Sequence, residues 1–156
     1  MDSTENHFLK EAIKKMERYC VYQERCHLEV QQKMYGWALT EEQKDTIIVH
    51  LIAQNFLNEE RFALEFTISK FHQKKWGKVR LENELKSRKL SNYLIKKAID
   101  SIPNQEYEET FHQLAEKTWN GINEKDSFKK RKKVGDFLLR KGYESDKIYE
   151  KIKELK

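Results

Sequence analysis

The sequence repeats one apolar pattern three times, at intervals of roughly fifty residues. In each copy an apolar residue is followed by a second one four positions later and by a third one five positions beyond that. An amphipathic stretch with helical spacing follows every copy. A period of this length built from helical pieces is typical of a tandem array rather than of an enzyme with one compact core. The copies are Val30, Met34 and Leu39; Leu81, Leu85 and Leu90; and Val134, Leu138 and Tyr143.

The composition favours helices. Charged residues make up 37% of the 156 residues, and five glycines and one proline are too few for a turn-rich β fold. We therefore expect an all-α protein, with three tandem three-helix repeats in an elongated, curved array. The repeats should span residues 8–57, 58–103 and 104–156, after a flexible segment at residues 1–7. Because units of this size bury little surface alone, they should pack on one another.

Local signals predict several helix ends. Thr40 and Gln43 have the spacing of a capping box, in which each side chain satisfies a backbone N–H group of the other residue. Ser91 can cap the third helix of the middle repeat, and Pro103 ends it. In the first repeat, the apolar spacing predicts a second helix over roughly residues 23–35.

The sequence shows no signal peptide and no membrane span. Its first residues are polar and acidic, and it has no run of about 18 apolar residues. Cys20 and Cys26 match neither a zinc pair nor a disulfide framework, so we interpret them as half-buried, reduced thiols. These features predict a cytoplasmic protein that does not bind a membrane.

The sequence contains no recognisable arrangement of catalytic residues. The five histidines lie on different expected helices without the spacing of metal ligands, and no glycine-rich phosphate loop occurs. Glu59 and Glu60 are adjacent, so on a helix their carboxylates diverge by about 100°. A role in complementing the helix dipole explains them better than acid–base chemistry does. We expect no catalytic residue, no metal, no cofactor and no enzymatic activity.

Charge is strongly segregated along the chain, although the net charge is only +5. Residues 1–69 carry 8 basic and 12 acidic side chains, whereas residues 70–97 carry 10 basic and two acidic ones. Residues 128–141 carry seven basic side chains and one acidic one. Two basic blocks in an otherwise acidic chain can attract a polyanion locally while the protein stays soluble.

We expect the two basic blocks to form a surface that binds a repeating polyanion or a helical filament, because the repeat brings cations to similar places in successive units. The competing explanation is that these lysines are simply solvated side chains at helix C-termini, where their charge complements the helix dipole. The middle block supplies Lys74, Lys75, Lys78, Arg80, Lys86, Arg88, Lys89, Lys96 and Lys97, and the last block supplies Lys129, Lys130, Arg131, Lys132, Lys133, Arg140 and Lys141.

Three tryptophans lie near the expected helix ends, at Trp37, Trp76 and Trp119. Stacking on nucleic-acid bases is one possible role for such side chains. Packing between neighbouring helices is favoured at these positions, because a large ring at a helix end wedges against the next element.

One segment identifies a family. Residues 56–63 contain a leucine, a short acidic run, an arginine, an aromatic residue and an alanine, and they resemble the most characteristic segment of the RecX family. Residues 76–81, 85–90 and 137–143 are also similar to that family, and the resemblance covers almost the whole chain. We interpret the matching motif residues as structural: Asn58, Glu59, Glu60, Arg61, Phe62, Ala63 and Gly77. Arg61 should pair with Glu65, four residues further along the helix.

The resemblance implies a modulator, usually an inhibitor, of the RecA recombinase, with roles in DNA repair, homologous recombination and the SOS response. Its family fold is three tandem three-helix repeats. Members are thought to lie in the groove of the RecA–DNA filament, lowering its ATPase and strand-exchange activities, and some bind single- or double-stranded DNA. The resemblance therefore implies that the two basic blocks contact RecA or DNA. We expect this chain to be a monomer. This sequence departs from the family in its first repeat, around Tyr22 and Gln23 and before Ile47.

An alternative function fits the same residues. The chain could be an autonomous DNA-binding helical repeat protein that affects recombination only indirectly. Binding of DNA without RecA, with a steep dependence on salt, distinguishes this alternative from a filament regulator.

Overall fold

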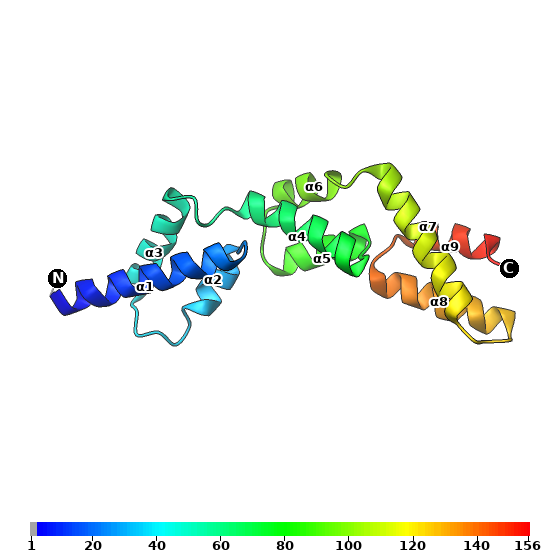
Figure 1. Ribbon diagram of the computed structural model, residues 1–156, viewed down its shortest axis with the longest axis horizontal. Helices are drawn as coiled ribbons and strands as arrows, with labels where there is room; N and C mark the ends of the chain where they lie inside the picture. The colour runs from blue at the N-terminus through cyan, green and yellow to red at the C-terminus, as the bar shows by residue number, and fades with distance from the viewer. Residues whose placement is uncertain (1–2) are drawn as a thin grey trace.

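The computed structural model describes residues 3–156, and over that range the chain forms nine α-helices and no strand (Figure 1). The predicted all-α class is therefore confirmed. The helices are α1 (Ser3–Tyr22), α2 (His27–Lys33), α3 (Glu41–Ala53), α4 (Glu59–Lys74), α5 (Lys78–Ser87), α6 (Asn92–Asp100), α7 (Asn104–Gly121), α8 (Ser127–Lys141) and α9 (Ser145–Glu154).

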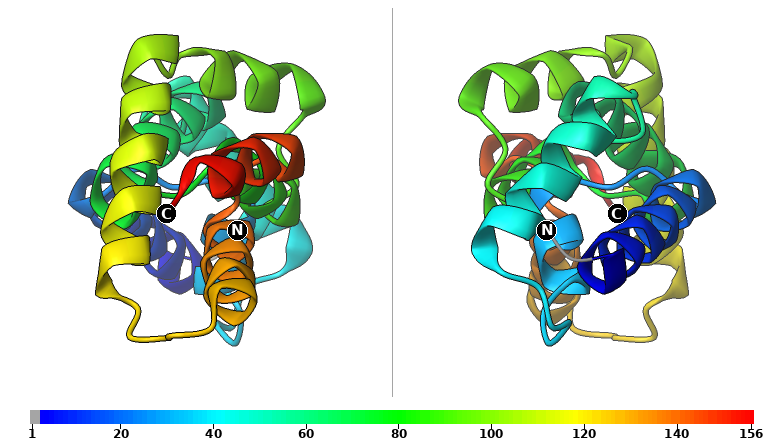
Figure 2. Two further views of the ribbon diagram at one scale, coloured as in Figure 1. Left: turned by 90° about the vertical axis from the view of Figure 1, so that its right-hand side faces the viewer. Right: turned by 90° about the vertical axis from the view of Figure 1, so that its left-hand side faces the viewer.

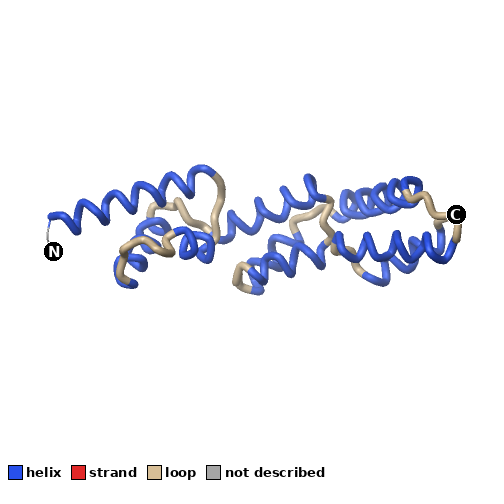
Figure 3. The backbone as a smooth tube through the Cα atoms, turned by 90° about the horizontal axis from the view of Figure 1, so that it is seen from below, coloured by secondary structure: helices blue, strands red, loops and turns tan. Residues whose placement is uncertain are grey.

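The helices follow one another in three groups along a single long axis. Helices α1–α3 lie at one end, α4–α6 in the middle and α7–α9 at the other end, and the connections between them are short (Figures 1 and 3). Viewed along the axis, the three groups overlap (Figure 2). The helices of the middle and last groups fall within the residue ranges expected for their repeats, whereas α1 begins at Ser3, before the expected start of the first repeat at residue 8.

Short polar residues fix several helix starts. The capping box of α3 is confirmed, because Gln43 N donates to Thr40 Oγ1 at 3.1 Å and Thr40 N donates to Gln43 Oε1 at 2.9 Å. Ser91 caps α6 as expected, since its hydroxyl oxygen accepts a hydrogen bond from Leu94 N at 3.2 Å. Each cap satisfies an N–H group that has no partner inside the helix.

The first repeat differs from the expected helix bounds. Helix α2 begins at His27, whereas the sequence predicts its start near residue 23. Arg25 explains the delay: its Nε donates to Tyr19 O at 3.0 Å and its guanidinium lies 3.6 Å from the centre of the Tyr19 ring. These contacts fold the chain back on α1 before α2 can start. Helix α1 itself includes residues 3–7, which we expected to be flexible, and residues 1–2 lie outside the described range.

Three apolar clusters form the core, and two of them cross a repeat boundary. The first cluster lies within α1–α3 and the residues that follow α3. The middle cluster, around Leu85 and Ile95, also contains Cys26 from the first repeat. The last cluster, around Phe111 and Leu138, also contains residues of the middle repeat, Phe71 and Leu81 among them. Neighbouring repeats therefore stabilise each other by shared burial.

The repeated apolar positions are buried as predicted. Eight of the nine are exposed by 6% or less, and Leu39 packs partly buried against the first cluster. Trp119 is buried, while Trp37 and Trp76 pack partly buried against their clusters, which confirms packing as their role. Cys20 and Cys26 are free thiols that are fully rather than half buried.

Across residues 3–156, no helix is both long and apolar enough to cross a membrane. The same residues hold no cluster of three or more histidine, cysteine, aspartate or glutamate side chains arranged to bind a metal ion.

Candidate functional site

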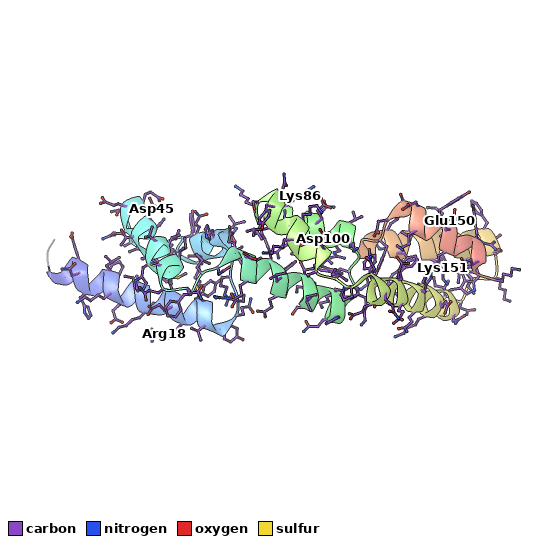
Figure 4. The ribbon with its side chains drawn as sticks, turned by 90° about the horizontal axis from the view of Figure 1, so that it is seen from above. Arg18, Asp45, Lys86, Asp100, Glu150 and Lys151 are labelled. Atoms are coloured by element: carbon purple, nitrogen blue, oxygen red, sulfur yellow. The ribbon has the colours of Figure 1, made fainter. Side chains whose placement is uncertain are left out.

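Several cations of the middle repeat are already paired with carboxylates. Lys86 Nζ lies 2.9 Å from Glu82 Oε1, and Lys96 Nζ lies 2.8 Å from Asp100 Oδ2. Figure 4 shows Lys86 and Asp100 among the side chains on this repeat. Lys97 pairs with Glu60 of α4. These are exposed ion pairs, so they add little to stability, but they neutralise part of the charge that the sequence concentrates here.

Two arginines of the middle repeat are held against aromatic rings. The guanidinium of Arg80 lies 4.2 Å from the centre of the Trp76 ring, and that of Arg88 lies 4.5 Å from the centre of the Phe66 ring. Glu84 pairs with both, since its Oε2 lies 3.0 Å from Arg88 Nη1 and its Oε1 lies 3.9 Å from Arg80 Nε. Stacking and ion pairing together fix the two guanidinium groups in place.

The basic run of α8 is largely engaged within the last repeat. Lys132 pairs with Asp136 at 3.2 Å, and Lys133 pairs with Glu124 at 3.0 Å. The hydrogen bond from Lys133 is the main reason that the pKa of Glu124 is lowered. The Nζ of Lys130 lies 4.3 Å from the centre of the Trp119 ring. The run therefore presents less free charge than its composition indicates.

Some of the predicted basic residues lie where two repeats touch, Lys141 and Arg80 with their side chains and Lys74, Lys75 and Arg140 with their backbone carbonyls. Lys141 Nζ donates to Lys74 O at 2.8 Å, although the two residues are 67 positions apart. Arg80 Nη1 donates to Arg140 O at 3.1 Å, and the hydroxyl of Tyr143 donates to Lys75 O at 2.8 Å. We call Lys74, Lys75, Arg80, Arg140 and Lys141 the joint cluster. Sequence spacing could not reveal it, because its members belong to different repeats.

Other predicted cations make contacts outside the joint cluster or are exposed. Lys78 faces α7, with its Nζ 4.6 Å from the centre of the Tyr107 ring. Arg131 Nη2 donates to Leu155 O at 3.4 Å. Lys89 is exposed just after α5, and Lys129 is exposed in the first turn of α8. The predicted cations therefore do not share one set of partners.

The family-motif residues are used inside the fold. Asn58 Oδ1 accepts a hydrogen bond from Arg61 N at 2.9 Å and so caps α4. Glu59 Oε2 accepts one from His27 N at 3.1 Å, which joins the first two repeats. Phe62 and Ala63 are buried in the middle cluster. These contacts support a structural role for the motif.

The expected pair between Arg61 and Glu65 is wrong. Arg61 Nε instead donates to Glu24 Oε1 at 2.7 Å, and its Nη2 donates to Asn55 O at 3.0 Å. Arg61 lies in the first turn of α4, where the loop before α2 and the end of the first repeat offer closer acceptors. A long-range partner therefore replaces the local one.

A charged cleft of about 650 Å³ lies between α7 and α9, and no pattern in the sequence indicated it. Lys151, only 6% exposed, lies 3.0 Å from Glu116 Oε1 and 3.5 Å from Glu154 Oε2, and Figure 4 shows it beside Glu150 on α9. The hydroxyl of Tyr107 donates to Glu144, and burial followed by this hydrogen bond raises the pKa of Tyr107. These contacts connect α9 and the residue before it with α7. The carboxylates of Glu116 and Glu154 also neutralise the charge of Lys151.

Comparisons with known proteins agree with this architecture. The family model for the second three-helix domain of RecX matches residues 58–99, and the model for the third three-helix domain matches residues 105–152. Together the two models cover more than half of the chain.

Curated relatives give the same family. Proteins named regulatory protein RecX from Bacillus thuringiensis (strain Al Hakam) and Bacillus cereus (strain AH187) are each 24% identical to this chain over 142 residues. The alignments cover 88% of this chain and 51% of each relative, so the chain spans about half the length of these relatives.

Solved structures share the fold. RecX from Lactobacillus salivarius superposes with a TM-score of 0.81 at 23% identity, covering 96% of this chain and 97% of that one. A second crystal structure, of a regulatory protein RecX, gives a TM-score of 0.81 at 21% identity, covering 94% of this chain and 72% of that one. The two domain matches, the curated relatives and the shared fold together show that this chain belongs to the RecX family.

Proposed function

We propose that this protein is a regulator, not an enzyme, that binds the RecA–DNA filament and inhibits the recombinase and ATPase activities of RecA. The observation that carries the proposal is the match of the middle and last repeats to the RecX domains. The curated relatives are named as regulatory proteins. We further propose that it acts as a monomer in the cytoplasm, during DNA repair and recombination.

The shape and charge of the chain support this proposal. An elongated array can follow a helical filament and contact several of its subunits at once (Figure 3). Many weak contacts on one rigid body add up to strong binding, because each contact raises the local concentration of the next. The acidic first repeat and the two basic blocks could face filament surfaces of opposite charge, which would set the orientation of binding.

Hydrolysis of ATP by RecA on single-stranded DNA tests the proposal. We expect the purified protein, added at substoichiometric amounts, to slow hydrolysis, because one bound regulator affects a cooperative filament beyond its own contacts. An unchanged rate at equimolar protein would contradict the proposed function.

A second function, autonomous DNA binding, is favoured by one observation. Over the described part of the chain, the side chains of Lys74, Lys75, Lys89, Lys129 and Arg140 have no carboxylate within ion-pair distance, so their charge is free for a partner. This function predicts binding to an oligonucleotide in the absence of RecA. Its affinity should fall steeply as salt rises, because each neutralised phosphate releases counterions.

A further inference from the structure

The first repeat has an apolar groove that its own helices leave uncovered. The groove has a volume of about 500 Å³ and lies between the second half of α1 and the chain that follows α3. Phe56 forms a half-buried wall that also packs against the first cluster, whereas Val21 is 72% exposed and Tyr22 is 84% exposed. The residues that line the groove are Lys14, Glu17, Arg18, Val21, Tyr22 and Phe56.

Local structure does not explain why Val21 and Tyr22 are apolar. Helix α1 ends at Tyr22, and its last buried residue is Cys20. Valine and tyrosine are poorer helix formers than lysine, glutamate or glutamine, so the exposed end of α1 gains no stability from them. The guanidinium of Arg25 lies 5.9 Å from the centre of the Tyr22 ring and restricts its position. An exposed apolar surface with a polar rim is typical of a contact site.

Cations border the groove along α1. Three of them precede Tyr22 at intervals of four residues, so the side chains neighbour one another along the helix. They are Lys10, Lys14 and Arg18. Within residues 3–156, Lys10 and Arg18 have no carboxylate at ion-pair distance, and Lys14 has Glu11 at 3.9 Å. Their charge therefore remains available to a partner.

The row of cations is a local exception in an acidic repeat. Residues 10–18 carry four basic and two acidic side chains, whereas residues 1–69 as a whole carry more acidic than basic ones. Glu17, the acidic residue in the groove, has its Oε2 2.9 Å from His50 Nε2 of α3. Figure 4 shows Arg18 and Asp45 at opposite edges of the first repeat. The groove thus combines an apolar wall with a basic rim.

We propose that this groove binds an acidic peptide segment of a partner protein, with one apolar side chain of the peptide packed between Tyr22 and Phe56. The apolar side chain is stabilised by leaving water, and carboxylates on the same segment pair with the cations of α1. A concave site accepts a projecting side chain, whereas a bilayer presents a flat surface. The groove lies outside residues 58–99 and 105–152, which match the RecX domains, and the inference goes beyond the proposed function.

Fluorescence anisotropy of labelled peptides tests the inference on the whole chain. The first peptide consists of aspartate, glutamate and serine with one phenylalanine. A second peptide has serine in place of the phenylalanine, and a third has lysine in place of the acidic residues. We expect the first peptide to bind with a Kd below about 1 mM. The other two should bind at least about tenfold more weakly, because each lacks one of the two features that the groove recognises.

Matched variants locate the binding. Tyr22→Ser and Tyr35→Ser each remove a ring of similar exposure, 84% and 85%, but Tyr35 lies outside the groove. We expect Tyr22→Ser to weaken binding of the first peptide about tenfold and Tyr35→Ser to change it less than about twofold. Arg18→Gln should weaken binding about threefold and reduce its salt dependence, whereas Lys117→Gln, at an exposed position on α7, should do neither. Thermal melts by circular dichroism verify that the variants are folded.

Other results would overturn the inference. The first peptide could fail to bind at about 1 mM, or Tyr22→Ser and Tyr35→Ser could lose equal affinity. A dimer in sedimentation velocity that Tyr22→Ser dissociates would mean that a second copy fills the groove. Binding to phosphatidylserine vesicles that the same substitution abolishes would mean that the groove contacts a membrane. None of these measurements contains RecA, so their failure leaves the proposed regulation standing.

Discussion

At the scale of single residues, two glycines allow the middle and last repeats to touch through their backbones. A Cβ atom on Gly77 would lie closer than 3.0 Å to the carbonyl of Gly142. Gly142 itself has a φ of 100°, and a Cβ atom there would meet Arg80. Backbone atoms cannot give way as a flexible side chain does. The contact between the repeats therefore depends on the absence of these two side chains.

Gly77→Ala should weaken this contact. Inserting one methyl group into a rigid site costs about 1–3 kcal/mol, and we expect the free energy of unfolding, measured with urea, to fall by this amount. Gly121→Ala is the control, because no atom lies within 4 Å of a Cβ added there. Equal stability of the two variants would contradict this view of the joint.

Alkaline pH should destabilise the fold. Burial raises the pKa of Cys26 to about 11 from 9.0, and burial also raises the pKa values of Cys20, Tyr107 and Tyr143. The folded state therefore favours the protonated, neutral form of each group, whereas the unfolded chain ionises at its usual pKa. Stability is fully present below about pH 9 and is lost as the pH rises toward 11.

Melting temperatures between pH 8 and pH 11 verify this effect. We expect a continuous fall above pH 9, and a smaller fall in Cys20→Ala/Cys26→Ala, which keeps the three tyrosines whose pKa burial raises, Tyr19, Tyr107 and Tyr143. A melting temperature that stays constant up to pH 11 would show that these groups ionise without unfolding.

At the scale of elements, the start of α4 organises the boundary between the first and middle repeats. Asn58 caps the helix, and Glu59 and Arg61 in its first turn bind His27 and Glu24 of the first repeat. The sequence predicted that the middle repeat begins at residue 58, but it did not predict these partners. A residue's helical neighbours are set by sequence spacing, whereas contacts across a loop depend on how the loop folds.

Asn58→Ala should remove the cap. Loss of an N-cap side chain costs about 1 kcal/mol, so we expect a decrease of this size in the free energy of unfolding. Asn58→Asp should restore most of the stability, since a carboxylate accepts the same hydrogen bond from Arg61 N. If alanine and aspartate behave alike, the side chain of Asn58 does not stabilise α4.

At the scale of the whole molecule, the two joints between repeats differ in strength. The last cluster takes in Phe71 and Leu81 from the middle repeat, and backbone hydrogen bonds reinforce this boundary. The first boundary depends on Cys26 in the middle cluster, on the pair of Arg61 with Glu24 and on the hydrogen bond from His27 N to Glu59. The middle and last repeats should therefore behave as one cooperative unit to which the first repeat is more weakly joined.

Native-state hydrogen exchange measures this difference. We expect the amides of α1 and α3 to exchange through openings of lower free energy than those of α5 and α8, because fewer contacts join the first repeat to its neighbour. Protection that is uniform across the helices would indicate that all three repeats unfold together.

The sequence by itself determined the helical class, the threefold repeat, the buried apolar positions and the family, because periodicity and capping act between residues a few positions apart. Only the tertiary structure decided which cations are neutralised by carboxylates and which gather at the joint between the last two repeats. Lys74 and Lys141 lie 67 positions apart, and they meet because the end of α8 docks on the start of α5. No local pattern encodes the docking of helix ends, so the joint cluster could be found only in the folded chain.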